Sequence, residues 1–128
     1  MPNLSQSRIG QIAVVCQDVE RARAFYRDTL GLTHLFDAGP TLSFFNCGGV
    51  RLMLSTAERP EDNRPGSVLY FVVGDIEATH GDLVARGVTV GAAPHLVAKM
   101  PDHDLWLAEF IDTEGNHLAL MEEKRSAA

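Results

Sequence analysis

Short apolar runs separated by polar and turn-forming residues cover most of the chain, and the first of them leads into a helical pattern. In residues 12–32 an apolar run precedes Asp18, a residue type that caps helix N-termini. Gly31 follows at the place where many helices end in a left-handed residue. The helix-face positions between them recur at helical spacing: Val19, Ala22, Phe25, Tyr26, Thr29 and Leu30. This pattern predicts a strand that leads into a helix.

The same arrangement returns in residues 68–88. Asp75, the second predicted cap, stands about 57 residues after Asp18, and Gly87 is the second predicted terminator. The helix-face positions here are Ile76, Thr79 and Leu83. A repeat of this length indicates one structural module that is written twice in the chain.

Strand patterns follow each predicted helix, and Gly- and Asn-containing turns at residues 46–49 and 113–116 suit hairpins. These predicted strands are residues 33–36, 41–46, 50–56, 95–100, 105–112 and 117–122. We therefore predict an α+β fold of two β-α-β-β-β modules, whose cupped mixed sheets carry the helices on their outer face.

A polar segment with two prolines separates the two modules. It divides the chain into module one (about residues 8–56), a linker (about residues 57–66) and module two (about residues 67–123). A module of about 60 residues with one helix leaves one sheet face unburied. We therefore predict a single domain over residues 1–128.

The uncovered sheet faces are the predicted location of function. Alternate residues of a strand point to opposite faces, so one set packs on the helix and the other lines the concave face. Trp106 and Phe110 are assigned to the helix side. In the last hairpin, Glu109 and Ala119 are expected to face each other. The residues assigned to the concave face are Gln11, Ala13, Val15, Arg51, Met53, Ser55, Val68, Tyr70, Val72, Leu105, Leu107, Glu109, His117, Ala119 and Met121, with Leu42 and Phe44 as an added apolar wall.

Composition and charge point to a small-molecule partner. The 128 residues are 45% hydrophobic and 22% charged, which is typical of a globular chain with an adequate core. A formal charge of −6 provides no basic stripe for nucleic acid or an anionic membrane, and the apolar runs are too short to span a bilayer. We expect a cytoplasmic protein in which Cys16 and Cys47 are reduced core thiols.

The phrase FYRDTLGL at residues 25–32, the closing segment 112–123 and the repeated module resemble the vicinal oxygen chelate superfamily over nearly the whole chain. That superfamily includes glyoxalases, bleomycin-resistance proteins and extradiol dioxygenases. In its metal-dependent members, the resemblance implies, four concave-face positions hold His or Gln, Glu, His and Glu around a divalent ion.

Those four positions fall here on Gln11, Met53, Val68 and Ala119, and three of these residues offer no ligand to such a cation. A shift of one residue in the strand register would place leucines of the predicted strands 50–56 and 117–122 at these positions. Such a shift does not restore the site. We predict no metal and no cofactor. A displaced metal site that combines Gln11 with Glu109 and His117 remains an alternative.

Glu109 is the candidate catalytic residue. Among Leu105, Leu107, Met53 and Val68 its carboxyl group would be desolvated, which raises the pKa toward that of a useful general acid or base. The competing interpretation places Glu109 on a solvated rim or in an ion pair with Arg51.

A candidate binding residue can have a role in ligand binding or a purely structural role. Arg51 could clamp a ligand oxygen or extend to solvent. Tyr70 could donate its hydroxyl or pack against the linker, and His117 could bind or lie on the surface. His103 could lie on a lid loop that covers the concave face, or it could belong to a solvated turn. Apolar contacts are assigned to Met53, Leu107, Leu42 and Phe44, and Gln11 offers its carbonyl oxygen.

Three functions fit these patterns. The first is a metal-independent isomerase, epimerase or lyase in which Glu109 moves a proton and Gln11, Arg51 or Tyr70 holds an oxyanion. The second is a protein that sequesters a planar, largely apolar compound, as bleomycin-resistance relatives do. The third is a metal enzyme with the displaced site.

Because modules in relatives pair within a chain or across a two-fold axis, and the linker is short, we also expect a homodimer.

Overall fold

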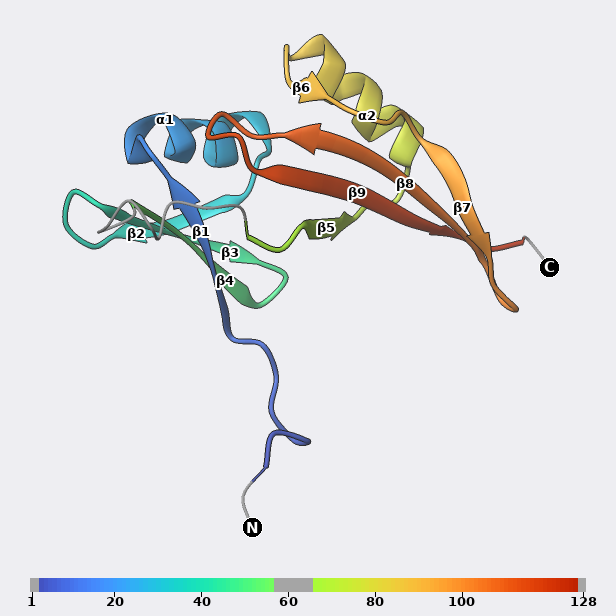
Figure 1. The fold of residues 1–128 in the computed structure, drawn as a ribbon, viewed down its shortest axis with the longest axis horizontal. Helices are drawn as coiled ribbons and strands as arrows, with labels where there is room; N and C mark the ends of the chain where they lie inside the picture. The colour runs from blue at the N-terminus through green and yellow to red at the C-terminus, as the bar shows by residue number, and fades with distance from the viewer. Residues whose placement is uncertain (1–2, 57–65, 127–128) are drawn as a thin grey trace. The chain divides into compact units, whose positions relative to one another are not determined.

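A computed structural model describes residues 3–56 and 66–126 (Figure 1). The chain divides into two compact units, Met1–Pro65 (unit one) and Gly66–Ala128 (unit two). Most of the predicted linker, residues 57–65, lies outside the described residues. No helix in the described part of the chain is both long and apolar enough to cross a membrane.

Unit one has the predicted β-α-β-β-β order. Its elements are β1 (Gln11–Cys16), α1 (Val19–Ala24), η1 (Phe25–Thr29), β2 (Thr33–Asp37), β3 (Leu42–Cys47) and β4 (Val50–Thr56). The strand order in its sheet is β1-β4-β3-β2, with β1 parallel to β4 and the other pairs antiparallel. The predicted mixed sheet is therefore confirmed for this unit.

The helix of unit one begins and ends where its sequence signals lie. The Asp18 side chain accepts a hydrogen bond from the Arg21 backbone N–H, and Gly31 has a φ of +78°. The second half of the helix, η1, is a π-helix, which the spacing did not predict. Its helix face meets the sheet in a core where Tyr26, Phe45 and Leu54 are fully buried.

Unit two repeats this plan with one extra strand. Its elements are β5 (Leu69–Val72), α2 (Ile76–Ala85), β6 (Thr89–Val90), β7 (His95–Lys99), β8 (Asp104–Ile111) and β9 (His117–Lys124). The strand order is β5-β9-β8-β6, and β7 also pairs with β8. The two-residue strand β6 was not predicted. It follows Gly87, whose φ of +81° ends the helix as expected.

The second helix packs on one face of its sheet, as Figure 1 shows for α2 over β8 and β9. Asp75 caps α2 by accepting a hydrogen bond from the Ala78 backbone N–H. Ile76 and Leu83 are buried on the sheet side of α2, and Phe110 and Leu118 are buried in the strands. The sheet face opposite the helix of the same unit is called the open face below.

Both cysteines are free thiols, as predicted. Cys16 is buried in β1, and Cys47 is half-buried at the end of β3. Desolvation raises the pKa of the Cys47 thiol above its ordinary value.

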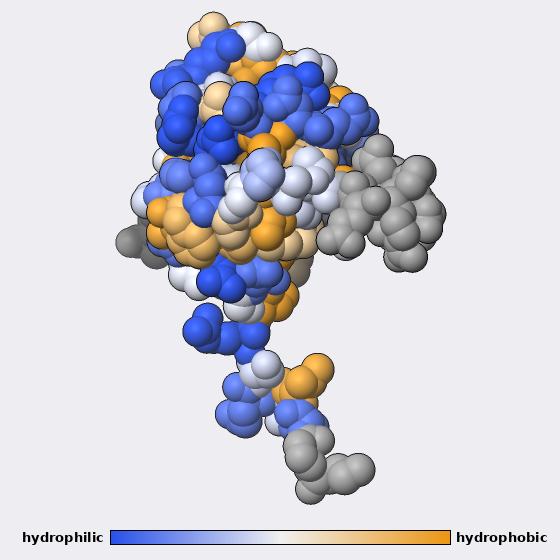
Figure 2. Space-filling view, turned by 90° about the vertical axis from the view of Figure 1, so that its left-hand side faces the viewer, coloured by the Kyte–Doolittle hydropathy of each residue, from blue (hydrophilic) through white to orange (hydrophobic). Residues whose placement is uncertain are grey.

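A β-bulge in β2 changes which residues reach the open face of unit one. Strict alternation would place His34 and Phe36 on the same face, but the pairing with β3 shifts between them. Phe36 therefore pairs with Phe44 and is 47% exposed, and Leu35 is 46% exposed. The side of the molecule in Figure 2 shows hydrophobic surface set between hydrophilic regions.

Candidate functional site

The open face of unit one consists of side chains in rows across the four strands. One row is polar and runs through Gln11, Arg51, Asn46 and Thr33. The next row is apolar and runs through Ala13, Met53, Phe44 and Phe36. A third row adds Val15, Ser55 and Leu42. The strand pairing thus confirms that the candidates Gln11, Arg51, Met53, Leu42 and Phe44 share one face.

Neighbouring side chains hold Arg51 in place, and no acid among the described residues of this face pairs with it. Its Nε donates a hydrogen bond to Gln11 Oε1 at 2.6 Å, and its Cζ lies 5.2 Å from the centre of the Phe44 ring. Gln11 Nε2 is in turn 3.8 Å from Met53 Sδ. These contacts orient the guanidinium along the boundary between the polar and apolar rows.

The open face of unit two brings Glu109 and Tyr70 to either side of a small residue. Tyr70 pairs with Ala119, and Ala119 pairs with Glu109. Ala119 is only 1% exposed, whereas the Tyr70 side of this row is open, with Tyr70 52% exposed. The predicted opposition of Glu109 and Ala119 is confirmed.

The neighbouring rows of this face hold the other candidates. Leu107 pairs with Met121 and with His95, and His117 pairs with Ile111 at the start of β9. Leu107 is half-buried, and His117 is exposed. Glu109 and His117 therefore share this face, whereas Gln11, the third member of the displaced metal site, belongs to unit one.

Glu109 is exposed, which corrects the expectation that apolar neighbours enclose it. Its Oε2 lies 3.4 Å from the Ala92 backbone N–H, which donates to it. A Cβ atom at Gly91 would meet the Glu109 Cβ and Oε2 atoms at 3.3 Å, so glycine leaves space for this side chain. Leu105 and Leu107 lie along the same strand and are half-buried, and they leave the carboxylate in contact with solvent.

His103 lies in an ion-paired cluster and not on a free lid. Its Nδ1 is 2.8 Å from Asp102 Oδ1, its Nε2 is 3.5 Å from Glu123 Oε2, and its side chain is 12% exposed. Arg125 bridges the same two carboxylates at 2.7 Å and 2.8 Å. The pKa of Asp102 is lowered to about 2, first by the hydrogen bond from Arg125 and then by that from His103. The cluster ties the β7–β8 turn to the end of β9.

The sequence profile of the glyoxalase/bleomycin resistance protein/dioxygenase superfamily matches residues 8–120. The chain belongs to this superfamily. No match was found among curated proteins.

Solved structures of the superfamily resemble the chain over most of its length. One is a lactoylglutathione lyase from Agrobacterium tumefaciens, with 26% identity, a TM-score of 0.72, and coverage of 91% of this chain and 93% of that one. A superfamily member from Sphaerobacter thermophilus DSM 20745 has 26% identity and a TM-score of 0.75, over 91% and 98% of the two chains. TnmS3, an antibiotic binding protein from Streptomyces sp. CB03234, has 26% identity and a TM-score of 0.71, over 95% and 100%.

The residues at the metal-binding positions of the superfamily do not fit a divalent ion in this member. Met53, Val68 and Ala119 have no side-chain oxygen or nitrogen. The side-chain carbonyl oxygen of Gln11, at the first of the four positions, already accepts the 2.6 Å hydrogen bond from Arg51. These four side chains therefore do not form a site for a divalent ion.

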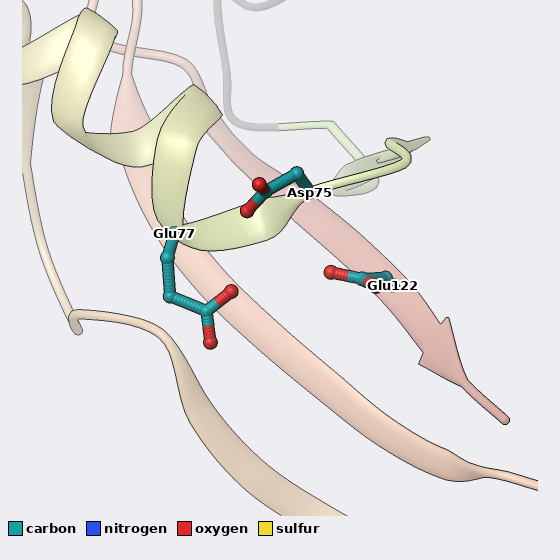
Figure 3. Close-up of side chains that lie close together, drawn as sticks. All are labelled: Asp75, Glu77 and Glu122. Atoms are coloured by element: carbon teal, nitrogen blue, oxygen red, sulfur yellow. The ribbon is translucent and has the colours of Figure 1, made fainter. Parts of the chain in front are cut away.

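A group of three carboxylates, Asp75, Glu77 and Glu122, lies at the start of α2, on the helix side of the sheet (Figure 3). Each has another role in the described structure. Asp75 caps α2, Glu122 accepts a hydrogen bond from the Ile76 N–H at 2.9 Å, and Glu77 pairs with Lys124 at 2.5 Å. Acidic side chains at a helix N-terminus are stabilised by the helix dipole, which accounts for the group without an ion.

Phe36 and Glu123 are among the open-face residues that the sequence reasoning missed. Phe36 reaches the open face of unit one only because of the bulge in β2. Glu123 pairs with Leu105 on the open face of unit two and contacts His103. Its alternation with Met121 along β9 was a signal that could have identified it.

Proposed function

We propose that this superfamily member binds a small, partly apolar molecule and moves a proton on it without a metal ion, in isomerase, epimerase or lyase chemistry. The proposed proton carrier is Glu109. The observation that carries this proposal is the row Tyr70–Ala119–Glu109. A carboxylate stands one strand away from the position where metal-dependent relatives have a carboxylate ligand, and an alanine occupies that position.

The row has the dimensions that a proton transfer requires. Neighbouring strands lie about 4.8 Å apart, so the backbones at Tyr70 and Glu109 are separated by about 10 Å. Ala119, a small residue that is 1% exposed, separates the two side chains in this row. From one side the Glu109 carboxylate takes the proton, and from the other the Tyr70 hydroxyl donates a hydrogen bond to the oxygen that becomes negative.

Because Glu109 is exposed, only a bound ligand would shield its carboxylate from water. A ligand seated beside Leu107 and Met121 removes water from the Glu109 carboxylate and so makes it a more reactive base. The same ligand removes exposed apolar surface of Tyr70 and its neighbour Val72, which is 74% exposed. Binding and activation of the base are therefore coupled.

Exchange of substrate hydrogen for deuterium tests this role. The wild-type protein, treated with a chelator, is incubated in D₂O with a panel of 2-oxo acids and thioesters, and loss of the α-proton signal is followed by NMR. For a compound that exchanges, Glu109→Gln is expected to abolish exchange and to leave the calorimetric Kd within about threefold. Glu20→Gln, which removes an exposed carboxylate from α1, is the matched control and should exchange like the wild type.

Two outcomes would refute the assignment. Equal exchange in Glu109→Gln and Glu20→Gln would exclude Glu109 as the proton carrier. Exchange that depends on added metal and disappears with the chelator would refute metal independence.

A second candidate function is sequestration of a ligand without chemistry. It is favoured by the similarity to an antibiotic binding protein, which extends over 95% of this chain. It predicts compounds that bind and show no exchange in the wild type, with affinity that is unaffected by Glu109→Gln.

We also propose that the chain forms a homodimer. The strands β1 and β5 each stand at the end of their sheet order, and Val68, Tyr70 and Val72 near β5 are 43%, 52% and 74% exposed. Apolar end strands of this kind favour burial against another chain. Light scattering is expected to give about twice the 14.0 kDa chain mass, and a mass of 14.0 kDa at micromolar concentration would contradict the dimer.

A further inference from the structure

The geometry points to a binding subsite on the open face of unit one for an aromatic carboxylate, in which Arg51 holds the carboxylate and the Phe36–Phe44 pair contacts the aromatic body. This assigns a ligand class to a face that the proposed proton transfer does not use. It rests on the proposed function only in that both require binding of a small molecule.

The charge of Arg51 is not neutralised in the described part of the chain. Within residues 3–56 and 66–126, its contacts are the neutral Gln11 amide oxygen and the Phe44 ring, and no carboxylate there pairs with it. Four of the other described arginines pair with acids within 3.2 Å: Arg23, Arg27, Arg86 and Arg125. In a chain with a formal charge of −6, an oriented guanidinium that no described carboxylate neutralises is the feature that distinguishes this face.

The contacts of Arg51 leave the end of the guanidinium available. Nε is used by Gln11, and the remaining N–H groups are on Nη1 and Nη2. These two nitrogens can donate a parallel pair of hydrogen bonds to one carboxylate. Because Gln11 and Phe44 already orient the group, less side-chain entropy is lost when an anion binds.

An apolar surface of aromatic character adjoins this anion position. The Phe36 and Phe44 rings are stacked, with centroids 4.7 Å apart and planes inclined by 26°. Phe36 is 47% exposed, Phe44 is 7% exposed, and Met53 pairs with Phe44 on the side away from Phe36. Aromatic rings stack on such a surface or meet it edge to face, and a thioether adds favourable contacts with a ring.

The polar and apolar rows together select a ligand with one charged end. Arg51 belongs to the polar row, and its guanidinium reaches the ring of the apolar row. In a ligand whose carboxylate is bonded directly to an aromatic ring, the charge and the ring are close enough to contact Arg51 and the phenylalanine pair at the same time. A neutral aromatic compound would leave the guanidinium without an anion, and an inorganic anion would leave the exposed Phe36 uncovered.

Isothermal titration calorimetry of the full chain with 2-naphthoate tests the subsite, with 2-naphthylmethanol as the neutral analogue and decanoate as the aliphatic carboxylate. The wild type is expected to bind 2-naphthoate at least about tenfold more tightly than either analogue. Arg51→Gln should weaken 2-naphthoate at least about tenfold and leave 2-naphthylmethanol unchanged. Arg27→Gln, which removes an exposed positive charge from η1, is the matched control and should bind like the wild type.

Two further variants separate the parts of the subsite. Phe36→Leu is expected to weaken 2-naphthoate and leave decanoate unchanged, because it removes the exposed ring and keeps an apolar side chain. Gln11→Leu removes the acceptor that orients Arg51 and should weaken 2-naphthoate less than Arg51→Gln does. Circular dichroism melting curves confirm that each variant is folded; Arg51, Gln11 and Phe36 are exposed, so folding should be retained.

The subsite would be overturned by equal affinity of the wild type for 2-naphthoate and 2-naphthylmethanol, or by equal affinity of Arg51→Gln and Arg27→Gln for 2-naphthoate. Absence of 2-naphthoate binding in the wild type at millimolar concentration would overturn it as well. None of these results depends on Glu109, so failure of the subsite and failure of the proposed proton transfer are distinguishable.

Discussion

Replacement of Asp112 by alanine is expected to destabilise the hairpin that positions Glu109 opposite Ala119. Asp112 follows β8 directly and is only 6% exposed. Its Oδ1 accepts hydrogen bonds from the backbone N–H groups of Glu114 and Asn116, both at 2.8 Å, and its Oδ2 accepts one from Asn116 Nδ2 at 2.9 Å.

The expected cost follows from the groups that lose their acceptor. Two half-buried backbone N–H groups lose a charged acceptor in Asp112→Ala, and each costs about 1–2 kcal/mol when it is left poorly satisfied. The Asn116 side-chain amide can hydrogen-bond to water instead, so the loss of its bond to Asp112 adds little to the cost. The expected loss is therefore about 2–4 kcal/mol in the free energy of unfolding, which corresponds to a fall of roughly 10 °C in Tm for a chain of this size.

Urea unfolding followed by far-ultraviolet circular dichroism measures this loss. Asp112→Asn keeps one carbonyl oxygen at the same place and should lose about half as much. Thr113→Ala changes an exposed side chain of the same turn and should cost less than about 0.5 kcal/mol. A loss below about 1 kcal/mol in Asp112→Ala, or equal losses in Asp112→Ala and Thr113→Ala, would refute the role of the carboxylate in this turn.

Three further predictions concern the core, a helix cap and pH. Phe45→Ala, at a fully buried position that contacts the Tyr26 ring, should lower the free energy of unfolding by about 3–5 kcal/mol in urea titrations, and a loss under 2 kcal/mol would contradict the packing. Asp75→Ala removes the α2 cap and should cost about 1 kcal/mol, whereas Asp75→Asn should cost less; equal values would argue against capping. Because the Asp102 pKa is about 2 in the folded protein and 3.8 ordinarily, its ion pairs contribute stability that is present above about pH 4 and is lost as the pH falls toward 2. Stability measured from pH 5 to pH 2 should therefore fall less steeply in Asp102→Asn than in the wild type, and identical slopes would count against this contribution.

Much of the fold and part of the site were predictable because they depend on local patterns. Asp18 and Asp75 cap the helices, and Gly31 and Gly87 end them, because each acts through backbone groups a few residues away. Strand alternation placed Gln11, Arg51, Met53, Glu109 and Ala119 on the predicted faces for the same reason, since a strand turns its side chains to alternate faces wherever bulges are absent.

What required the tertiary structure depends on partners distant in the sequence. The bulge that brings Phe36 beside Phe44 is a feature of the pairing between β2 and β3, which alternation within one strand does not reveal. The orientation of Arg51 depends on Gln11, 40 residues earlier, and the position of His103 depends on the later residues Glu123 and Arg125 through their shared ion pairs. Local side-chain chemistry and periodicity therefore determined the modules and their two faces, whereas long-range pairing decided which polar groups on those faces are exposed, oriented or already paired.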